Sequence, residues 1–214
     1  PKATYEIPYG YMERPVNGEE EPGQQWVDIG GMTAGNGNEP YGLALLNDCK
    51  YSFDVKENDL RMTVVRSPIY ADHFGERDEY CEYMDQGTHE LRYVLIPHAG
   101  EWRDCQVIKR AYELNVQPIQ IIETYHKGTA PQKFEGIRIS AGNVIAAALK
   151  KAEDGNGYIL RCYETAGRAA VATIEVPFLN RKWTASFGRC EIKTFRILAV
   201  IESEIEENNL LELP

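Results

Sequence analysis

A group of polar and aromatic side chains follows a short apolar run near the middle of the first half of the chain. The run covers residues 43–46, and Asn47, Asp48, Lys50 and Tyr51 come directly after it. Their amide, carboxylate, ammonium and phenol groups suit a sugar, whose hydroxyls need paired donors and acceptors and whose ring face needs an aromatic platform. They also suit a turn, which the residue types alone favour, because Asn and Asp cap their own backbone. The residue types therefore leave two interpretations, a binding site or a turn.

Other motifs that usually mark an active site do not occur in the sequence. Retaining glycosidases need two carboxylates about 5 Å apart, but a chain with 33 acidic residues always offers such pairs, so their abundance is no evidence. No serine stands in a Gly-x-Ser-x-Gly setting, which excludes the usual nucleophile elbow. The glycines at 30, 35 and 37 are not followed by Lys-Ser/Thr, so they form no phosphate loop.

Metal binding has one weak candidate. Asp72 with His73, and Asp85 with His89, could ligate zinc if the fold brought them together. Histidines without ligand spacing are usually structural. We therefore expect His89 and His98 to be hydrogen-bonded residues in strands or at strand ends, and we expect no metal site or cofactor in this chain.

Charge and cysteine usage narrow the class of protein. The net charge is -10 with no basic patch, which argues against nucleic acid. No apolar run approaches the roughly 18 residues of a membrane span. Five cysteines, an odd number without Cys-x-x-Cys spacing, indicate free thiols in a reduced, cytoplasmic protein. They are Cys49, Cys81, Cys105, Cys162 and Cys190.

Most of the chain shows the short apolar patterns of β-strands. Residues 170–176 alternate strictly, and hairpins are expected around Asn58-Asp59 and around 154–157. The mostly apolar run 91–96 is typical of a strand in the middle of a sheet. Gly30-Gly31 is expected to end a strand that begins at Trp26, and 18–23, rich in Glu and Gly, is expected to be an exposed loop.

One segment changes to helical spacing. Between 101 and 115, Trp102, Cys105, Ile108 and Tyr112 recur on one face, which predicts an amphipathic helix. The resulting fold class is all-β, an antiparallel β-sandwich with one short amphipathic helix. We expect residues 1–115 to belong to a larger, supersandwich-like part that ends in this helix, and 116–214 to form a smaller terminal sandwich.

The stretch 41–55 resembles a strand of glycoside hydrolase family 38, the α-mannosidases, in which Gly-[Val/Leu]-Ala-Leu-Leu-Asn-Asp-Cys-Lys-Tyr-Gly recurs. Two departures are visible, Ser52 where Gly is usual and Cys190 where an aromatic residue is usual. The resemblance covers nearly the whole chain and is closest to the bacterial and cytosolic-type branch. The other matching pieces are 5–10, 13–15, 21–28, 60–62, 66–68, 85–89, 97–98, 161–164, 167–168 and 191–195.

The resemblance implies that the chain is the non-catalytic C-terminal β region of an α-mannosidase. The parent enzyme would hydrolyse terminal α-mannosides with retention at a zinc site on its N-terminal catalytic domain. The family's His-x-Asp hallmark does not occur in this chain, so we expect the fragment to be inactive alone and zinc to belong to the parent. Its partners would be that catalytic domain and the α-mannoside substrate, whereas the sequence indicates no oligomeric state.

In this setting Asn47, Asp48, Lys50 and Tyr51 are candidates for contact with substrate or with the catalytic domain, beside the turn alternative. A stand-alone carbohydrate-binding module is the second interpretation of the whole chain, because several tyrosines flank expected turns. An autonomous hydrolase is the least favoured.

Overall fold

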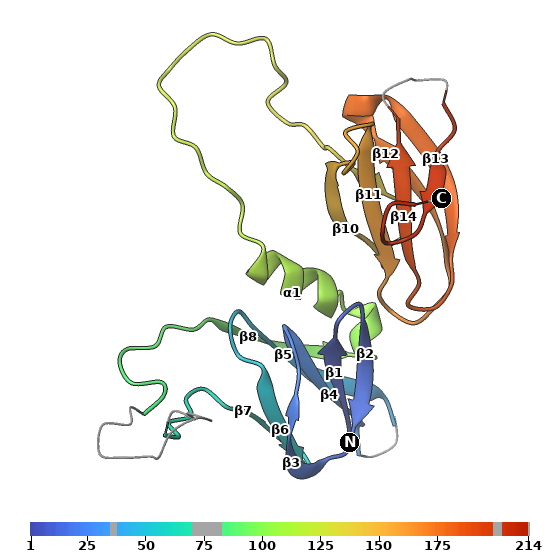
Figure 1. The fold of residues 1–214 in the computed structure, drawn as a ribbon. Helices are drawn as coiled ribbons and strands as arrows, with labels where there is room; N and C mark the ends of the chain where they lie inside the picture. Colours follow the sequence, from blue (N-terminus) through green and yellow to red (C-terminus); the bar gives the residue numbers. More distant parts are fainter. Residues whose placement is uncertain (35–37, 70–82, 199–202, 214) are drawn as a thin grey trace, which may run out of the picture. The chain divides into compact units, whose positions relative to one another are not determined.

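The computed structural model describes residues 1–34, 38–69, 83–198 and 203–213. It divides into two compact units, Pro1–Gln117 and Pro118–Pro214, and each is described by itself. Antiparallel strands dominate both, and the described ranges contain one α-helix (Figure 1). The expected all-β class with sandwich architecture and a short helix is confirmed.

Two antiparallel sheets form the first unit, with strand orders β2-β1-β4-β5-β8 and β3-β6-β7. The strands of the larger sheet are β1 (Lys2–Ile7), β2 (Gly10–Arg14), β4 (Trp26–Met32), β5 (Pro40–Asn47) and β8 (Tyr93–Ala99). Those of the smaller sheet are β3 (Asn17–Pro22), β6 (Ser52–Lys56) and β7 (Asp59–Met62). The turn between β6 and β7 confirms the hairpin expected around Asn58-Asp59.

The buried strand expected at 43–46 is confirmed as part of β5, which lies between β4 and β8. Successive side chains of a strand point to opposite faces, so an uninterrupted apolar run needs cover on both faces. Ala44 and Leu46 are buried on one face and Leu45 on the other. The larger sheet is therefore the middle layer of this unit.

The smaller sheet covers one face of this layer. The buried cluster there consists of Ala3, Tyr5, Val27, Leu45, Phe53 and Val55. The rings of Tyr5 and Phe53 meet edge to face with centroids 6.3 Å apart. The cluster draws on both sheets and so joins them into a sandwich.

Helical turns cover the opposite face, as a 3-10 turn η1 (Trp102–Asp104) and helix α1 (Val107–Asn115). The rings of Trp26 and Trp102 lie 4.8 Å apart, and α1 contacts β5 and β4. The helix expected at 101–115 is confirmed, but it begins later because Gln106 has a left-handed backbone with φ of 56°. Its buried residues are Val107, Ile108 and Ala111, all of them on the apolar face expected for this helix, whereas Cys105 lies before the helix begins.

Three local predictions for the first unit are wrong. Residues 18–23 form most of β3 and pair with β6 instead of forming a loop. The glutamates fit there because β3 is an edge strand, where charged side chains can point into solvent. Gly30-Gly31 does not end β4, which continues to Met32 opposite Pro40. The segment 91–96 is not a central strand in the described part of the chain, because β8 has β5 as its one neighbour.

The second unit also has two antiparallel sheets, with strand orders β10-β11-β14-β15 and β13-β12-β9. The strands are β9 (Arg138–Ile139), β10 (Val144–Lys151), β11 (Tyr158–Glu164), β12 (Ala170–Val176), β13 (Arg181–Phe187), β14 (Ile192–Ile197) and β15 (Glu206–Asn208), with a 3-10 turn η2 (Pro177–Leu179). The β10–β11 hairpin around 154–157 and the strand at 170–176 are confirmed. Their shared core is Val144, Leu160, Cys162, Ala172, Ile174, Val176, Phe187, Phe195 and Ile197.

Candidate functional site

Asn47 ends β5 as a buried turn cap with 1% of its surface exposed. Its Oδ1 accepts hydrogen bonds from the backbone N–H groups of Cys49 at 3.1 Å and Lys50 at 2.5 Å. Its Nδ2 donates to the carbonyl oxygen of Gln24 at 3.1 Å. Asn115 of α1 donates its side-chain amide to the Asn47 carbonyl at 3.0 Å. Asn47 thus joins a turn, β5 and the end of the helix.

Asp48 is engaged with Arg92, immediately before β8. Its Oδ1 accepts from the backbone N–H of Arg92 at 3.0 Å, and its Oδ2 accepts from the Arg92 Nε at 3.0 Å. The Arg92 backbone N–H is the largest cause that holds the pKa of Asp48 below its usual range. Asn47 therefore caps its own turn, as the turn alternative describes, whereas Asp48 binds a residue 44 positions away in the chain.

Lys50 and Tyr51 present more of their side chains to solvent. Tyr51 is 63% exposed, and Lys50 is half-buried. The four candidate residues therefore lie in one turn, with the first two directed into the fold. Lys50 and Tyr51 remain the members whose side chains could meet another molecule or domain.

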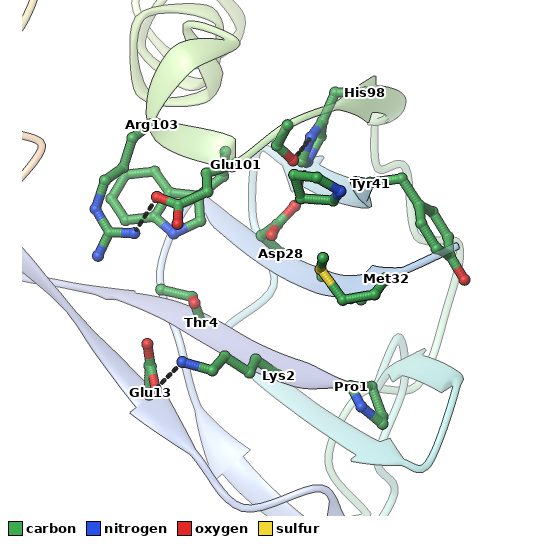
Figure 2. Close-up of a pocket in the computed structure, with 15 residues that line it drawn as sticks. Pro1, Lys2, Thr4, Glu13, Asp28, Met32, Tyr41, His98, Glu101 and Arg103 are labelled. Carbon is green, nitrogen blue, oxygen red and sulfur yellow. Dashed lines mark hydrogen bonds and ion pairs between the residues drawn. The ribbon is translucent and has the colours of Figure 1, made fainter. Parts of the chain in front are cut away.

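A cavity of about 500 Å³ opens elsewhere in the first unit (Figure 2). β1, β2, β4, β5 and the segment from β8 to η1 contribute its walls. Its chemically distinctive lining residues are Lys2, Glu13, Asp28, Met32, Tyr41, His98, Glu101, Trp102 and Arg103. Tyr41 is 50% exposed and Met32 51% exposed, so both give the cavity an apolar rim.

A buried acid–base pair lies at the inner side of this cavity (Figure 2). The His98 Nε2 lies 2.7 Å from the Asp28 Oδ1, and each side chain is 3% exposed. Gly42 on β5 leaves the space for the imidazole, because a Cβ there would lie 2.5 Å from the His98 Cε1. His98 is thus a hydrogen-bonded residue within a strand, as expected for it.

Both ring nitrogens of His98 have a partner. Its Nδ1 is 3.2 Å from the carbonyl oxygen of Gly100, which can accept from an Nδ1–H. Its Nε2 is bonded to the Asp28 carboxylate. Burial raises the pKa of Asp28, and the bond from His98 opposes that rise. Such a pair could hold a hydroxyl or move a proton at the cavity wall.

Cationic and anionic groups alternate around the outer part of the cavity. The Arg103 guanidinium lies 4.5 Å from the Trp102 ring centroid and 4.8 Å from that of Tyr11. Its Nη1 is 3.1 Å from a Glu101 carboxylate oxygen. The Lys2 Nζ lies 3.6 Å from the Glu13 Oε2. The cavity therefore offers donors, acceptors and aromatic surface together.

The sequence analysis did not identify the Asp28–His98 pair as a site. The two residues are 70 positions apart and follow no ligand spacing, so only their presence in the matching pieces 21–28 and 97–98 hinted at them. The weak metal candidates are not assembled in the described part, where the His89 Nε2 contacts the backbone oxygen of Asp85 at 2.9 Å. Asp72 and His73 lie outside the described residues.

The described residues contain no group of three or more His, Cys, Asp or Glu side chains placed to hold a metal ion. Among the same residues, no helix has the length and apolar character that crossing a membrane requires.

Comparison with known families matched both ends of the chain. Residues 1–74 match the glycosyl hydrolases family 38 C-terminal domain. Residues 143–214 match the family 38 C-terminal beta sandwich domain.

Curated relatives and solved structures agree with these matches. Alpha-mannosidase G of Dictyostelium discoideum is 30% identical over 191 residues, which are 82% of this chain and 16% of that protein. Alpha-mannosidase 2C1 of Mus musculus is 31% identical over 179 residues, 78% of this chain and 15% of that protein. An alpha-mannosidase from Enterococcus faecalis V583 shares the fold with a TM-score of 0.72 at 14% identity, over 92% of this chain and 24% of that one. The chain spans about one sixth of the length of these curated relatives.

Proposed function

This chain belongs to the C-terminal region of glycosyl hydrolase family 38, and from that premise we propose that it is the non-catalytic β region of an α-mannosidase. The parent hydrolyses terminal α-mannosides with retention, at a site in its N-terminal catalytic domain. Residues 1–115 belong to the larger sandwich and 116–214 to the smaller terminal one. The observation that carries the proposal is the order of the two family matches, at residues 1–74 and 143–214, in a chain similar to several α-mannosidases.

The role of the region is to support the catalytic domain and to line part of its substrate cleft. Zinc belongs to the parent's catalytic domain in this proposal. The described side chains of this chain do not assemble a three-ligand set for it. The protein is cytoplasmic in the same proposal, which the odd cysteine number and irregular spacing support.

Turnover by matched preparations tests the proposal. We expect the full-length parent to hydrolyse an aryl α-mannoside and to contain zinc by elemental analysis. The 214-residue chain, once circular dichroism shows that it is folded, should give no turnover above a buffer control and no stoichiometric zinc. Turnover by the folded chain alone would refute a non-catalytic role.

A stand-alone carbohydrate-binding module is the second candidate, and the cavity beside Asp28 and His98 favours it. Tyr41 offers a half-exposed ring, and the carboxylate of Glu13 and the ammonium of Lys2 could pair with hydroxyls. Aromatic surface with a few placed polar groups is the usual composition of a small-ligand site.

Calorimetric titration of the folded chain with mannose oligosaccharides separates the two candidates. A binding module gives saturable heat that Tyr41→Ala abolishes, whereas Tyr125→Ala, at a 97% exposed ring outside the cavity, leaves it unchanged. If the chain is a structural region only, the unchanged chain and both variants give no saturable heat.

A further inference from the structure

The outer edge of β8 is open in the described part of the chain, since β8 pairs with β5 alone. The three residues at its start are apolar and exposed, Tyr93 at 59%, Val94 at 40% and Leu95 at 51%. A strand edge with unpaired N–H and C=O groups is a template for another strand.

The hydrogen bonds of the β5–β8 ladder show which backbone groups point outward. Asp48 donates its N–H to the Arg92 carbonyl at 3.2 Å, and Gly100 donates to the Pro40 carbonyl at 2.7 Å. In an antiparallel pair, hydrogen-bonded positions alternate with positions whose backbone groups face away. Even-numbered residues from 92 to 100 therefore face β5, and Tyr93, Leu95, Pro97 and Ala99 face outward.

Two features limit the open edge to its first residues. Pro97 has no N–H to donate on the outer side, where an edge strand tolerates proline. The Cys105 thiol donates a hydrogen bond to the Ala99 carbonyl oxygen at 3.3 Å, so this outward carbonyl already has a partner. The complete outward donor and acceptor pairs are thus those of Tyr93 and Leu95, and we call 93–95 the β8 window.

Every other edge strand in the described sheets contains at least one Lys, Arg, Asp or Glu. The edge strands are β2, β3, β7, β9, β10, β13 and β15, with residues such as Glu13, Glu20, Arg61, Arg138, Lys150, Lys182 and Glu207. Charged side chains are a common protection of edges against unwanted pairing. In β8 the one titratable side chain besides Tyr93 is His98, which is buried against Asp28. The β8 window therefore lacks the protection that the other edges have.

We propose that a short β-strand from the upstream part of the same parent polypeptide pairs with the β8 window. This inference rests on the proposed function, because it takes this chain as the C-terminal region of a longer enzyme. The chain spans about one sixth of its curated relatives, and both matched family models are C-terminal domains, so most of the parent is available as the source. Pairing at an exposed edge supplies affinity through main-chain hydrogen bonds, and the flanking side chains supply selectivity.

A second copy of the chain is a poorer occupant. Each copy carries a net charge of -10, so two copies repel each other. A window of three residues also offers few hydrogen bonds to offset the cost of association. A strand tethered in the same polypeptide avoids most of that cost through its high effective concentration.

The turn after β5 positions this edge. Asp48 holds Arg92 by its backbone N–H and its Nε, which fixes the residue before the β8 window. Asn47 is the cross-strand partner of Tyr93. Asn47 and Asp48 thus act on the proposed interface as positioning residues, without touching the incoming strand.

A photo-cross-linker identifies the occupant in the full-length parent. We replace Tyr93 by p-benzoylphenylalanine, irradiate, and map the joined peptides by mass spectrometry. The expected partner peptide comes from upstream of this chain. A peptide from within the 214 residues, or from another copy in a mixture of isotopically heavy and light protein, overturns the proposal, as does the absence of any cross-link.

Amide hydrogen exchange of the full-length parent gives an independent test with an internal control. The Val94 amide faces β5 and is expected to be protected in any case, whereas Tyr93 and Leu95 are protected only if a strand covers the edge. We expect all three amides to exchange slowly, at a rate that does not change on tenfold dilution. Fast exchange at Tyr93 and Leu95 beside a slow Val94 overturns the proposal, and so does protection that dilution removes.

A charged substitution in the β8 window completes the design. Leu95→Lys should raise the exchange rates of Tyr93 and residue 95 at least tenfold. Val171→Lys, at a 66% exposed position of the central strand β12, should leave them unchanged. Hydrolysis of an aryl α-mannoside by the wild-type parent is measured on the same preparation. Absence of turnover would refute the proposed function, whereas fast exchange of the Tyr93 and Leu95 amides would refute the edge pairing alone.

Discussion

The β-sheets of the two units are covered by different kinds of elements. In the second unit, two sheets enclose a core to which nine of the described buried residues belong, and its edge strands carry charged side chains. In the first unit, the larger sheet is covered by a small sheet on one face and by η1 and α1 on the other. That unit also has a cavity that holds the buried Asp28–His98 pair, and an apolar edge strand without Lys, Arg, Asp or Glu. The described part of the second unit has hollows of similar volume. The contrast between the units therefore lies in the buried acid–base pair and the unprotected β8 edge, and these direct the search for an interface to the first unit.

The largest expected effect tests the closed core of the second unit. Phe187 is 2% exposed, and its ring meets that of Phe195 at 6.3 Å. Phe187→Ala should lower the free energy of unfolding of this unit by about 3–5 kcal/mol, through lost burial and a cavity. Residue-resolved hydrogen exchange measures it, and Val171→Ala on the exposed face is the matched control. Equal loss of protection in the first unit would show that the two units unfold together and would weaken the comparison.

A buried carboxyl in the first unit predicts a pH dependence. Glu6 is 7% exposed and accepts the Gln25 N–H at 2.6 Å, and burial raises the pKa of Glu6 to about 7. The folded state then binds the proton more tightly than the unfolded state, so stability falls as pH rises from about 4.5 to about 7 and is constant above. The total fall is at most about 3.5 kcal/mol, at about 1.4 kcal/mol for each unit by which the pKa of Glu6 is raised.

Thermal or denaturant unfolding across that pH range checks the prediction. Glu6→Gln should flatten the profile, because Gln keeps an acceptor for the Gln25 N–H without a charge to bury. Glu13→Gln, at a half-exposed side chain beside Lys2, should leave the slope in place. A profile of the wild type that is already flat would show that Glu6 does not titrate in this range.

Sequence patterns predicted the fold where local periodicity decides the structure. The apolar run of β5, the hairpin around 154–157 and the alternation of β12 each carry their own signal. The wrong predictions concern segments whose structure depends on which other strands pair with them. Whether 91–96 is central or at an edge depends on which strands pair with it, and the glutamates of 18–23 are compatible with a strand once β6 lies beside them.

Prediction of the candidate site was less complete for the same reason. The residue types at 47–51 indicated a turn as one of two alternatives. The contacts of Asn47 fit that alternative, whereas Asp48 binds the distant Arg92, which residue types could not show. The Asp28–His98 pair could not be predicted, because it depends on the register of β4, β5 and β8 and on the missing side chain of Gly42. No spacing rule connects residues 70 positions apart.

A buried carboxylate of the second unit gives the next smaller effect. Glu164 is fully buried, and its two oxygens accept from the Asn143 side chain and from the backbone N–H groups of Ala166, Arg168 and Cys190. Glu164→Gln replaces one acceptor oxygen by a donor, which leaves backbone N–H groups without an acceptor and should cost about 1–3 kcal/mol. Glu207→Gln, at an exposed ion pair with Lys193, should cost less than about 0.5 kcal/mol. Equal costs in chemical denaturation would mean that Glu164 does not organise these turns.

The smallest expected effect returns to Asp48, where a binding role and a positioning role predict different measurements. Asp48→Ala removes the acceptor of two bonds from Arg92 and should lower the stability of the first unit by about 1 kcal/mol. Because the pKa of Asp48 is lowered in the fold, this contribution is present above the unfolded value of about 4 and is lost as pH falls through the folded value.

A double-mutant cycle with Arg92→Ala in the full-length parent decides between the roles. For a positioning residue we expect the two stability losses to be coupled, kcat/KM to stay within about twofold, and exchange at Tyr93 and Leu95 to rise. Lys56→Ala, at an exposed position at the end of β6 and outside the turn, should change none of these quantities. A lowered kcat/KM with an unchanged Tm would instead assign the Asp48 carboxylate to the substrate cleft, and it would extend the contrast between the two units from folding to catalysis.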